Sequence, residues 1–228
     1  MDAPVAYIPD LVWKADEAFE RLMAELPWER YGLPRDEVYF NDTMAPYTYG
    51  SPGRERTYEP EALWHPTVLD IRAMVEDAII GAGCGGVMDV CFCNRYMGAR
   101  DQLGWHADDS PEMDPSRPIV TVSLGAERDI QFIQFRTTAD HRDAIMRVGS
   151  PHIETLTLGH GSAAIMKPGM QQGWFHRIPK SSVSNIGPRI SLTFRGYLSE
   201  VDQIDRHHAS SLADEVEVER LGADYFDS

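Results

Sequence analysis

The sequence is short of the features that mark exported, membrane-spanning or disulfide-bonded proteins. Among its 228 residues are 3 cysteines, Cys84, Cys91 and Cys93. An odd number of cysteines does not indicate a disulfide framework, and no Cys-x-x-Cys pair offers a zinc site. No apolar run approaches the roughly 18 residues that a membrane-spanning helix needs, and the first residues carry no basic-then-apolar export signal. We therefore expect a cytoplasmic protein that does not contact membranes.

Positive charge is also scarce. The chain has 36 Asp and Glu against 21 Lys and Arg, a net charge of −15 at pH 7. This balance argues against broad contact with phosphate groups. Residues 199–228 carry −7 of that charge and the other 198 residues carry −8. We interpret residues 199–228 as an acidic C-terminal extension of a single domain over residues 1–198, and we expect a monomer.

Two helical patterns precede a long series of strand patterns. Apolar side chains recur at helical spacing near residues 19–26 and 66–80. From Met88 onward the period changes to two, in seven segments: 90–96, 118–125, 129–135, 153–159, 162–168, 173–179 and 189–198. The connection 136–152 is expected to be a loop or a short helix. Strands that follow two helices in this way indicate an α+β fold, a sandwich or jelly roll backed by N-terminal helices.

The last strand pattern, "RISLTFR", places Arg189, Ser191, Thr193 and Arg195 on one face and apolar side chains on the other. The apolar face suits packing against a helix, so the polar face would point into the jelly roll. Buried arginines are costly unless anions meet them. Their Cα atoms would lie roughly 20 Å apart, which leaves room between them for a small dicarboxylate. The alternative is an edge strand with two surface arginines.

The stretch "GWHADDSPEMDP" contains a His-x-Asp pair, His106 and Asp108, and His176 follows in a later strand pattern. Each histidine alone is more often a hydrogen-bonded residue, and the stretch alone could be an acidic surface loop. Together, two imidazoles and a carboxylate form a facial triad that leaves metal positions open and suits Fe(II). A later inward-facing arginine strengthens the metal hypothesis.

Five segments, in order and at their spacing, resemble the AlkB family of Fe(II)/2-oxoglutarate dioxygenases over residues 34–197: "NRYMGARDQLGWHADD", "RPIVTVSLGAERDIQF", "LGHGSAAIM", "WFHRIP" and "PRISLTFR". The resemblance implies a double-stranded β-helix core over about residues 88–198 and a nucleotide-recognition lid over about residues 34–60. It also implies Fe(II), 2-oxoglutarate and O2 as cofactor and cosubstrates.

The resemblance assigns roles to individual positions. His106, Asp108 and His176 match the iron ligands. Arg189 matches the arginine that binds the distal carboxylate of 2-oxoglutarate, a task for which a bidentate guanidinium is suited, and Arg195 matches a second arginine near the metal aspartate. The further cosubstrate contacts that it implies are Asn94, Tyr96, Ser191 and Thr193, with Ser191 standing where the family commonly has Asn.

On the substrate side, the resemblance implies Tyr47 and Tyr49 as residues that stack on a flipped base, although both could instead pack the lid. Trp105 is expected to help wall the site and Asp109 to contact the substrate. DNA-repair members of the family often have an acidic residue where this chain has Ser110. The stretch "LPWERYGLPR" (26–35) is also shorter than the hairpin with which duplex-specific members probe base pairs.

The function that the resemblance implies is oxidative N-demethylation of nucleobases in alkylated nucleic acid. The short segment before the lid and the acidic balance favour single-stranded DNA or RNA over duplex DNA. The alternative is a dioxygenase that hydroxylates another substrate: a modified base, a free nucleotide or a protein side chain. A binding module without activity is disfavoured, because every iron position and the primary cosubstrate position are filled.

Overall fold

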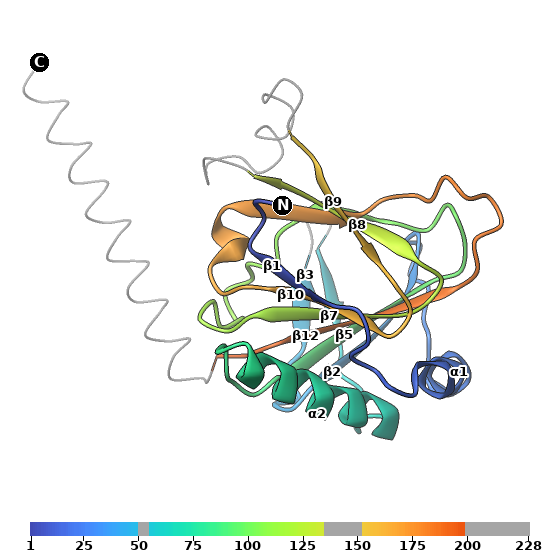
Figure 1. The fold of residues 1–228 in the computed structure, drawn as a ribbon. Helices are drawn as coiled ribbons and strands as arrows, with labels where there is room; N and C mark the ends of the chain where they lie inside the picture. Colours follow the sequence, from blue (N-terminus) through green and yellow to red (C-terminus); the bar gives the residue numbers. More distant parts are fainter. Residues whose placement is uncertain (50–54, 135–151, 199–228) are drawn as a thin grey trace, which may run out of the picture.

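The computed structural model describes residues 1–49, 55–134 and 152–198 (Figure 1). Of the expected connection 136–152, all but residue 152 lies outside the described residues. The acidic extension 199–228 lies entirely outside them. In chain order, the elements are β1 (Val5–Ile8), α1 (Ala15–Glu25), β2 (Asp36–Asn41), β3 (Tyr47–Tyr49), β4 (Arg56–Tyr58), α2 (Pro66–Gly81), β5 (Val90–Tyr96), β6 (Leu103–His106), β7 (Ile119–Gly125), β8 (Arg128–Gln134), β9 (Glu154–Leu158), β10 (Ser162–Met166), the 3-10 helix η1 (Met170–Gln172), β11 (Trp174–Ile178) and β12 (Arg189–Arg195).

Two antiparallel sheets form the body of the molecule. A six-stranded sheet has the order β1-β10-β7-β12-β5-β2 and a four-stranded sheet the order β6-β11-β8-β9, while β3 and β4 form a separate hairpin. Figure 1 shows the four-stranded sheet on one side of the six-stranded sheet and both helices on the other. This arrangement confirms the predicted jelly roll with N-terminal helices.

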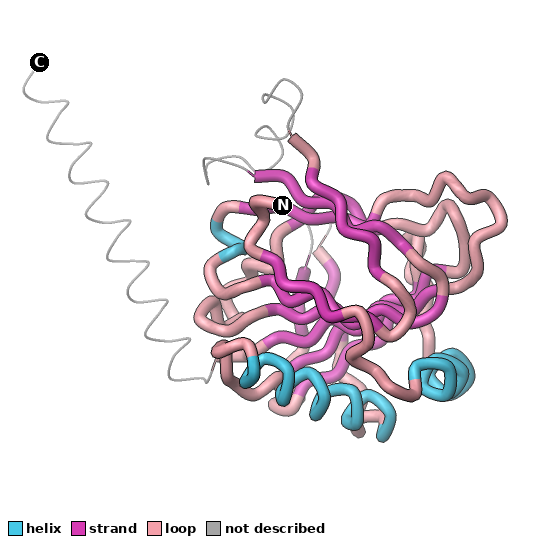
Figure 2. Tube along the Cα trace, viewed as in Figure 1, coloured by secondary structure: helices cyan, strands magenta, loops and turns pink. Residues whose placement is uncertain are grey.

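The helices cover the outer face of the six-stranded sheet, as Figure 2 shows in cyan. Leu22 of α1 and Ile71 of α2 are buried in one core with Ile190, Leu192 and Phe194 of β12. The predicted alternation of β12 therefore holds: its apolar side chains face the helices and its polar ones face the other sheet. Capping fixes the start of α2, because the ring Nδ1 of His65 accepts a hydrogen bond from the Thr67 backbone N–H and Pro66 occupies the first turn.

The seven predicted strands are present, with ends shifted by up to three residues, and five further strands were not predicted. The most consequential of these is β2, because residues 36–41 belonged to the expected lid. They pair instead with β5 at the edge of the six-stranded sheet, and all six are buried, including Asp36, Glu37 and Asn41. Polar side chains on its inner face concealed this strand from a search for apolar alternation. The hairpin β3–β4 also lies within residues 34–60, the range expected to form the lid.

Within the described ranges, no helix is long and apolar enough to cross a membrane. Cys91 and Cys93 are buried free thiols, and Cys84 is also free. The predicted lack of disulfides among these residues therefore agrees with the structure.

Candidate metal and cosubstrate site

Two histidines and an aspartate converge between the sheets. His106, the last residue of β6, lies opposite His176 in the antiparallel pair β6–β11, and their ring centroids are 4.1 Å apart. Asp108 follows two residues after β6. Its Oδ1 lies 3.7 Å from His106 Nε2, and its Oδ2 lies 3.6 Å from His176 Nε2. The structure therefore brings together the three residues that the sequence predicted as metal ligands.

Both imidazoles are set up as neutral ligands. His106 Nδ1 is 2.9 Å from the Gly104 carbonyl oxygen. Because a carbonyl only accepts, Nδ1 carries the proton and the lone pair of Nε2 is directed toward Asp108. Burial lowers the pKa of His106, and burial together with the neighbouring His106 lowers the pKa of His176 to about 3. A divalent metal requires this neutral form.

The Asp108 carboxylate is kept ionised. Burial alone would raise its pKa, but the charge of Arg195 and its hydrogen bond lower it, and the pKa lies below its ordinary value. Arg195 Nη2 donates to Asp108 Oδ1 at 2.6 Å, and the Asp108 backbone N–H donates to Gln171 Oε1 at 2.9 Å. Asp108 Oδ2 is buried and has no hydrogen-bond partner among the described residues. An ionised oxygen without a partner beside two neutral imidazoles fits a divalent metal ion.

Arg189, at the other end of β12, is a buried cation whose hydrogen-bond partners among the described residues are both serine hydroxyls. Its side chain is fully buried, with Nε donating to Ser123 Oγ at 2.8 Å and Nη2 to Ser191 Oγ at 3.3 Å. Nη1 has no partner within the described chain. Burial lowers the Arg189 pKa to about 10, so the guanidinium stays charged at neutral pH. The site therefore fits a carboxylate, which would neutralise the charge and occupy Nη1.

The other predicted cosubstrate residues lie on the same inner face. The Tyr96 ring lies between two guanidinium groups, 5.3 Å from Arg189 and 5.5 Å from Arg128, and burial raises its pKa. Thr193 is buried and lies on the same face of β12, two residues before Arg195. The polar face of β12 and its neighbours thus runs from the unpaired cation to the metal triad.

Two charged residues of this site were not found from the sequence. Arg35 Nε donates to Asn94 Oδ1 at 2.7 Å, and Arg35 Nη2 pairs with Glu37 Oε1 at 2.5 Å. Both side chains are buried. A small cavity of about 30 Å³ lies against this group and the metal triad, lined by Arg35, Tyr47, Tyr58, Phe92, Asn94, Leu103, His106, Asp108 and Arg195. The alternation of Glu37, Tyr39 and Asn41 was a possible signal for an inward-facing strand there.

Tyr47 lines this cavity from the β3–β4 hairpin. It is 3% exposed, and its hydroxyl shares a 2.7 Å hydrogen bond with Ser110 Oγ. Its ring packs against Tyr39, Tyr58 and Phe92. Tyr47 therefore packs against neighbouring rings and also forms a cavity wall, so both of the roles considered for it are compatible with its position. The side chain of Tyr49 lies outside the described residues.

The other two predicted substrate contacts do not line the cavity. Trp105 lies on the opposite face of β6 from His106, where it packs against Ala107, Ile133 and Phe175. The Arg177 guanidinium lies 4.4 Å from its ring. Strand alternation explains this correction, because an inward His106 sends its neighbour outward. Asp109 is exposed.

The jelly roll and its two-histidine, one-carboxylate triad define the class of non-haem Fe(II) oxygenases. A family model described as "2OG-Fe(II) oxygenase superfamily" matches residues 5–195. The chain belongs to this superfamily, and its relatives place it among the AlkB-like members.

Three comparisons support this placement. "Alpha-ketoglutarate-dependent dioxygenase alkB homolog 3" of Bos taurus is 32% identical over 191 residues, which are 80% of this chain and 61% of the relative. "DNA oxidative demethylase ALKBH2" of Homo sapiens is 30% identical over 190 residues, 81% of this chain and 69% of the relative. The chain thus spans about three fifths of the length of the first relative. A solved structure described as "The structure of OsALKBH1" shares the fold, with a TM-score of 0.57 at 17% identity, covering 86% of this chain and 99% of the other.

Proposed function

We propose that this protein catalyses Fe(II)- and 2-oxoglutarate-dependent oxidative dealkylation of nucleobases, removing N-methyl groups from single-stranded DNA or RNA more readily than from duplex DNA. One observation supports the reaction class above all: two of the metal-triad residues, His106 and His176, come from the four-stranded sheet, and Arg189 comes from the six-stranded sheet opposite it. Arg189 Nη1 is buried without a hydrogen-bond partner among the described residues, so the space between the sheets offers places for a metal and for the far end of a dicarboxylate.

His106, Asp108 and His176 would hold Fe(II), and Arg189 would bind the distal carboxylate of 2-oxoglutarate. When bound, Fe(II), 2-oxoglutarate and O2 supply the oxidising power that hydroxylates an N-methyl group, and the hydroxymethyl product then releases formaldehyde. Asn94, Tyr96, Ser191 and Thr193 would orient the cosubstrate. Arg195 holds the Asp108 carboxylate in a fixed direction.

The aromatic residues around the cavity would exclude water from the reaction. Tyr47, Tyr58 and Phe92 are buried and line it together, so a base that enters must displace or slide past these rings. Base recognition by stacking between aromatic side chains is the general solution for enzymes that act on extruded bases. The Tyr47–Ser110 pair would offer hydroxyl groups to the edge of such a base.

The nucleic-acid substrate is supported by the relatives, one of which is named a DNA oxidative demethylase. The preference for single strands is supported by the segment before β2. Tyr31 in that segment is 46% exposed, and the Arg56 guanidinium lies 3.5 Å from its ring. The edge of Tyr31 contacts Tyr58, which lines the cavity. A cation stacked on an exposed ring suits an unpaired flanking base and a phosphate, whereas a net charge of −15 suits a long duplex poorly.

The test uses oligonucleotides that carry 1-methyladenine or 3-methylcytosine, in single-stranded and duplex form, incubated with the full chain, Fe(II), 2-oxoglutarate and O2. We expect loss of the methyl mass and release of formaldehyde and succinate, faster on single strands, and none with the His176→Ala variant. Succinate formation without any loss of methyl groups would instead support a dioxygenase with another substrate. Equal or faster reaction on duplex DNA would contradict the single-strand preference.

A further inference from the structure

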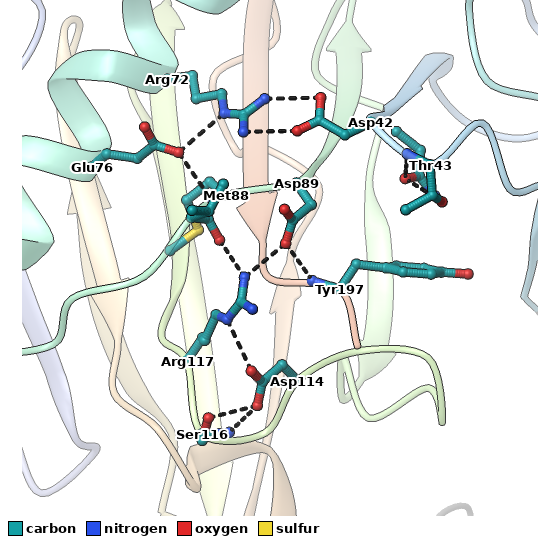
Figure 3. Close-up of polar contacts among 12 residues, drawn as sticks. Asp42, Thr43, Arg72, Glu76, Met88, Asp89, Asp114, Ser116, Arg117 and Tyr197 are labelled. Atoms are coloured by element: carbon teal, nitrogen blue, oxygen red, sulfur yellow. Dashed lines mark hydrogen bonds and ion pairs between the residues drawn. The ribbon is translucent and has the colours of Figure 1, made fainter. Parts of the chain in front are cut away.

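Beyond the metal ligands, two arginines each bridge acidic side chains near one end of the sheets (Figure 3). Arg72 of α2 binds Asp42 through both terminal nitrogens, at 3.0 and 2.8 Å, and Glu76 through Nε at 3.1 Å. Arg117 bridges Asp89 and Asp114, at 2.7 and 2.9 Å. The two networks resemble each other chemically and meet at residues 87–89, where Glu76 Oε1 accepts the Met88 backbone N–H at 2.8 Å. Of the two arginines, Arg117 is the one that pairs with Asp114.

The second network, which we call the Arg117 clamp, consists of Arg117, Asp89 and Asp114. Arg117 Nη1 also donates to the Val87 carbonyl oxygen at 2.6 Å. Asp89 Oδ2, which receives Arg117, accepts the Tyr197 backbone N–H at 3.0 Å as well. The clamp thus joins three places: the start of β5, the loop that follows the metal aspartate, and the chain just beyond β12.

The loop after Asp108 is attached at both ends to consecutive residues of the β12 exit. At one end, Arg195 Nη2 binds Asp108. At the other, the Asp114 backbone N–H donates to the Gly196 carbonyl oxygen at 3.0 Å. Residues 108–114 are therefore held at Asp108 by Arg195 and at Asp114 by Gly196 and the Arg117 clamp. Ser110, the hydrogen-bond partner of Tyr47, lies between these two points.

Asp114 is well suited to fix that far end. Burial would raise its pKa, but hydrogen bonds from Ser116 and the Arg117 charge lower it below the ordinary value. Ser116 contributes its backbone N–H at 2.9 Å and its hydroxyl at 2.6 Å. The carboxylate is therefore ionised at neutral pH and has hydrogen-bond donors at both oxygens, which holds the loop in one geometry.

Gly196 has no side chain and so leaves room for the side chain of Arg117. A Cβ added at this position would lie 2.2 Å from Arg117 Cδ and 2.9 Å from its Nε. An alanine there would force the Arg117 side chain out of its place without removing any charge. The residue that follows Arg195 is thus a glycine because the Arg117 side chain lies over it.

We propose that Arg117 is a positioning residue for the metal site: by holding Asp114 against the β12 exit, it fixes residues 108–114 and with them the direction of the Asp108 carboxylate and the Tyr47–Ser110 wall. This inference rests on the proposed function. Residues that orient metal ligands typically change metal affinity ~10–100-fold when they are removed.

The experiment compares Arg117→Met and Gly196→Ala with Arg72→Met as the matched control. Arg72 has the same kind of partners and a more buried side chain, 13% exposed against 26% for Arg117, but the carboxylates that it binds, Asp42 and Glu76, lie outside residues 108–114. Each full-length variant is titrated with Mn²⁺, a redox-stable probe for the Fe(II) site, and its thermal midpoint is measured without metal.

We expect Arg117→Met and Gly196→Ala to bind Mn²⁺ ~10-fold more weakly than wild type, and Arg72→Met to bind it as wild type does while losing at least as much thermal stability as Arg117→Met. Arg117→Lys, which keeps the charge but cannot span both carboxylates, should fall between wild type and Arg117→Met. Under turnover, the KM for 2-oxoglutarate and the methylated oligonucleotide should rise in the two clamp variants.

Wild-type Mn²⁺ affinity in Gly196→Ala and Arg117→Met would overturn the proposal, as would an equal loss in Arg72→Met. If Arg117→Met does not fold, Gly196→Ala decides, because it displaces the side chain and keeps its charge. Failure of the wild-type chain itself to bind Mn²⁺ would count against the proposed function and, with it, this inference, whereas Mn²⁺ binding without demethylation would leave the clamp supported.

Discussion

The two arginines of β12 are both buried and lie on the same face of the strand, but their electrostatic surroundings are opposite. Arg195 is 7% exposed and pairs with the Asp108 carboxylate at 2.6 Å. Arg189 is fully buried and has two serine hydroxyls and an aromatic ring as its described neighbours. Arg195 has its counter-charge in Asp108, whereas Arg189 has no carboxylate partner within the described ranges.

This difference indicates what each end of the strand is for. A paired buried charge fixes a geometry, because both partners lose freedom together. An unpaired buried charge is costly to the folded protein, and it persists where a ligand supplies the missing anion. The Arg195 end therefore orients Asp108, and we propose that the Arg189 end binds a carboxylate supplied by a ligand.

The largest effect should follow from removing the unpaired cation. In Arg189→Met we expect the affinity for 2-oxoglutarate to fall by about 4 kcal/mol, or ~1,000-fold, because a desolvated charge pair is lost. The stability of the metal-free protein should hold or rise, because a buried charge without a partner disappears. Calorimetric titration with Mn²⁺ present and urea unfolding measure the two quantities. Arg189→Lys, which keeps the charge without the bidentate fork, is the control, and unchanged affinity in Arg189→Met would refute the assignment.

Removing the paired cation, Arg195, should instead lower the stability of the metal-free protein. Arg195→Met leaves the buried Asp108 carboxylate without its counter-charge, so we expect the metal-free protein to lose about 3 kcal/mol of unfolding free energy. Mn²⁺ should restore part of that loss, since the ion supplies positive charge to the same carboxylate. Urea unfolding with and without Mn²⁺ tests this. The double variant Arg195→Met/Asp108→Asn should be more stable than the single variant, and the opposite order would contradict the pairing argument.

The smallest expected effect is the dependence of stability on acidic pH. It arises from His176, which lies beside Asp108 at the Arg195 end of β12. The His176 pKa is about 3 in the folded protein, against about 6.5 for an unfolded histidine. Between these values the unfolded chain binds more protons, so the stability of the metal-free protein should fall as the pH decreases through this window, by up to about 1.4 kcal/mol per pH unit. Urea unfolding at pH 7, 6 and 5 should show a shallower slope for His176→Gln. An identical slope would mean that His176 is not buried as a neutral group.

The sequence predicted the parts of the site that depend on strand alternation and local spacing. The inward polar face of β12 follows from a period of two, and His106 and Asp108 are close because only one residue separates them. The same rule shows why Trp105 was misplaced: a residue adjacent to an inward-facing histidine in a strand has to face outward.

The remainder depends on pairings between segments that are distant in sequence. Arg35 and Glu37 lie at the site because β2 pairs with β5, whereas the family resemblance had implied a lid over these residues. The Arg117 clamp depends on Asp89 and Gly196, which lie far from Arg117 along the chain. The sequence around Asp89, Gly196 and Arg117 does not indicate that these residues contact one another.

The place of β12 in its sheet has a consequence for how the site comes into being. It is the last described strand along the chain, yet it lies between β7 and β5 and joins the two halves of the six-stranded sheet. Contacts between distant segments form slowly, so the insertion of this strand is expected to be a late step of folding. Until then, Asp108 lacks Arg195, and the proposed cosubstrate site lacks Arg189. A nascent chain that has not yet released residue 195 from the ribosome therefore lacks one of these arginines, so the proposed oxygenase centre is complete only in the finished domain.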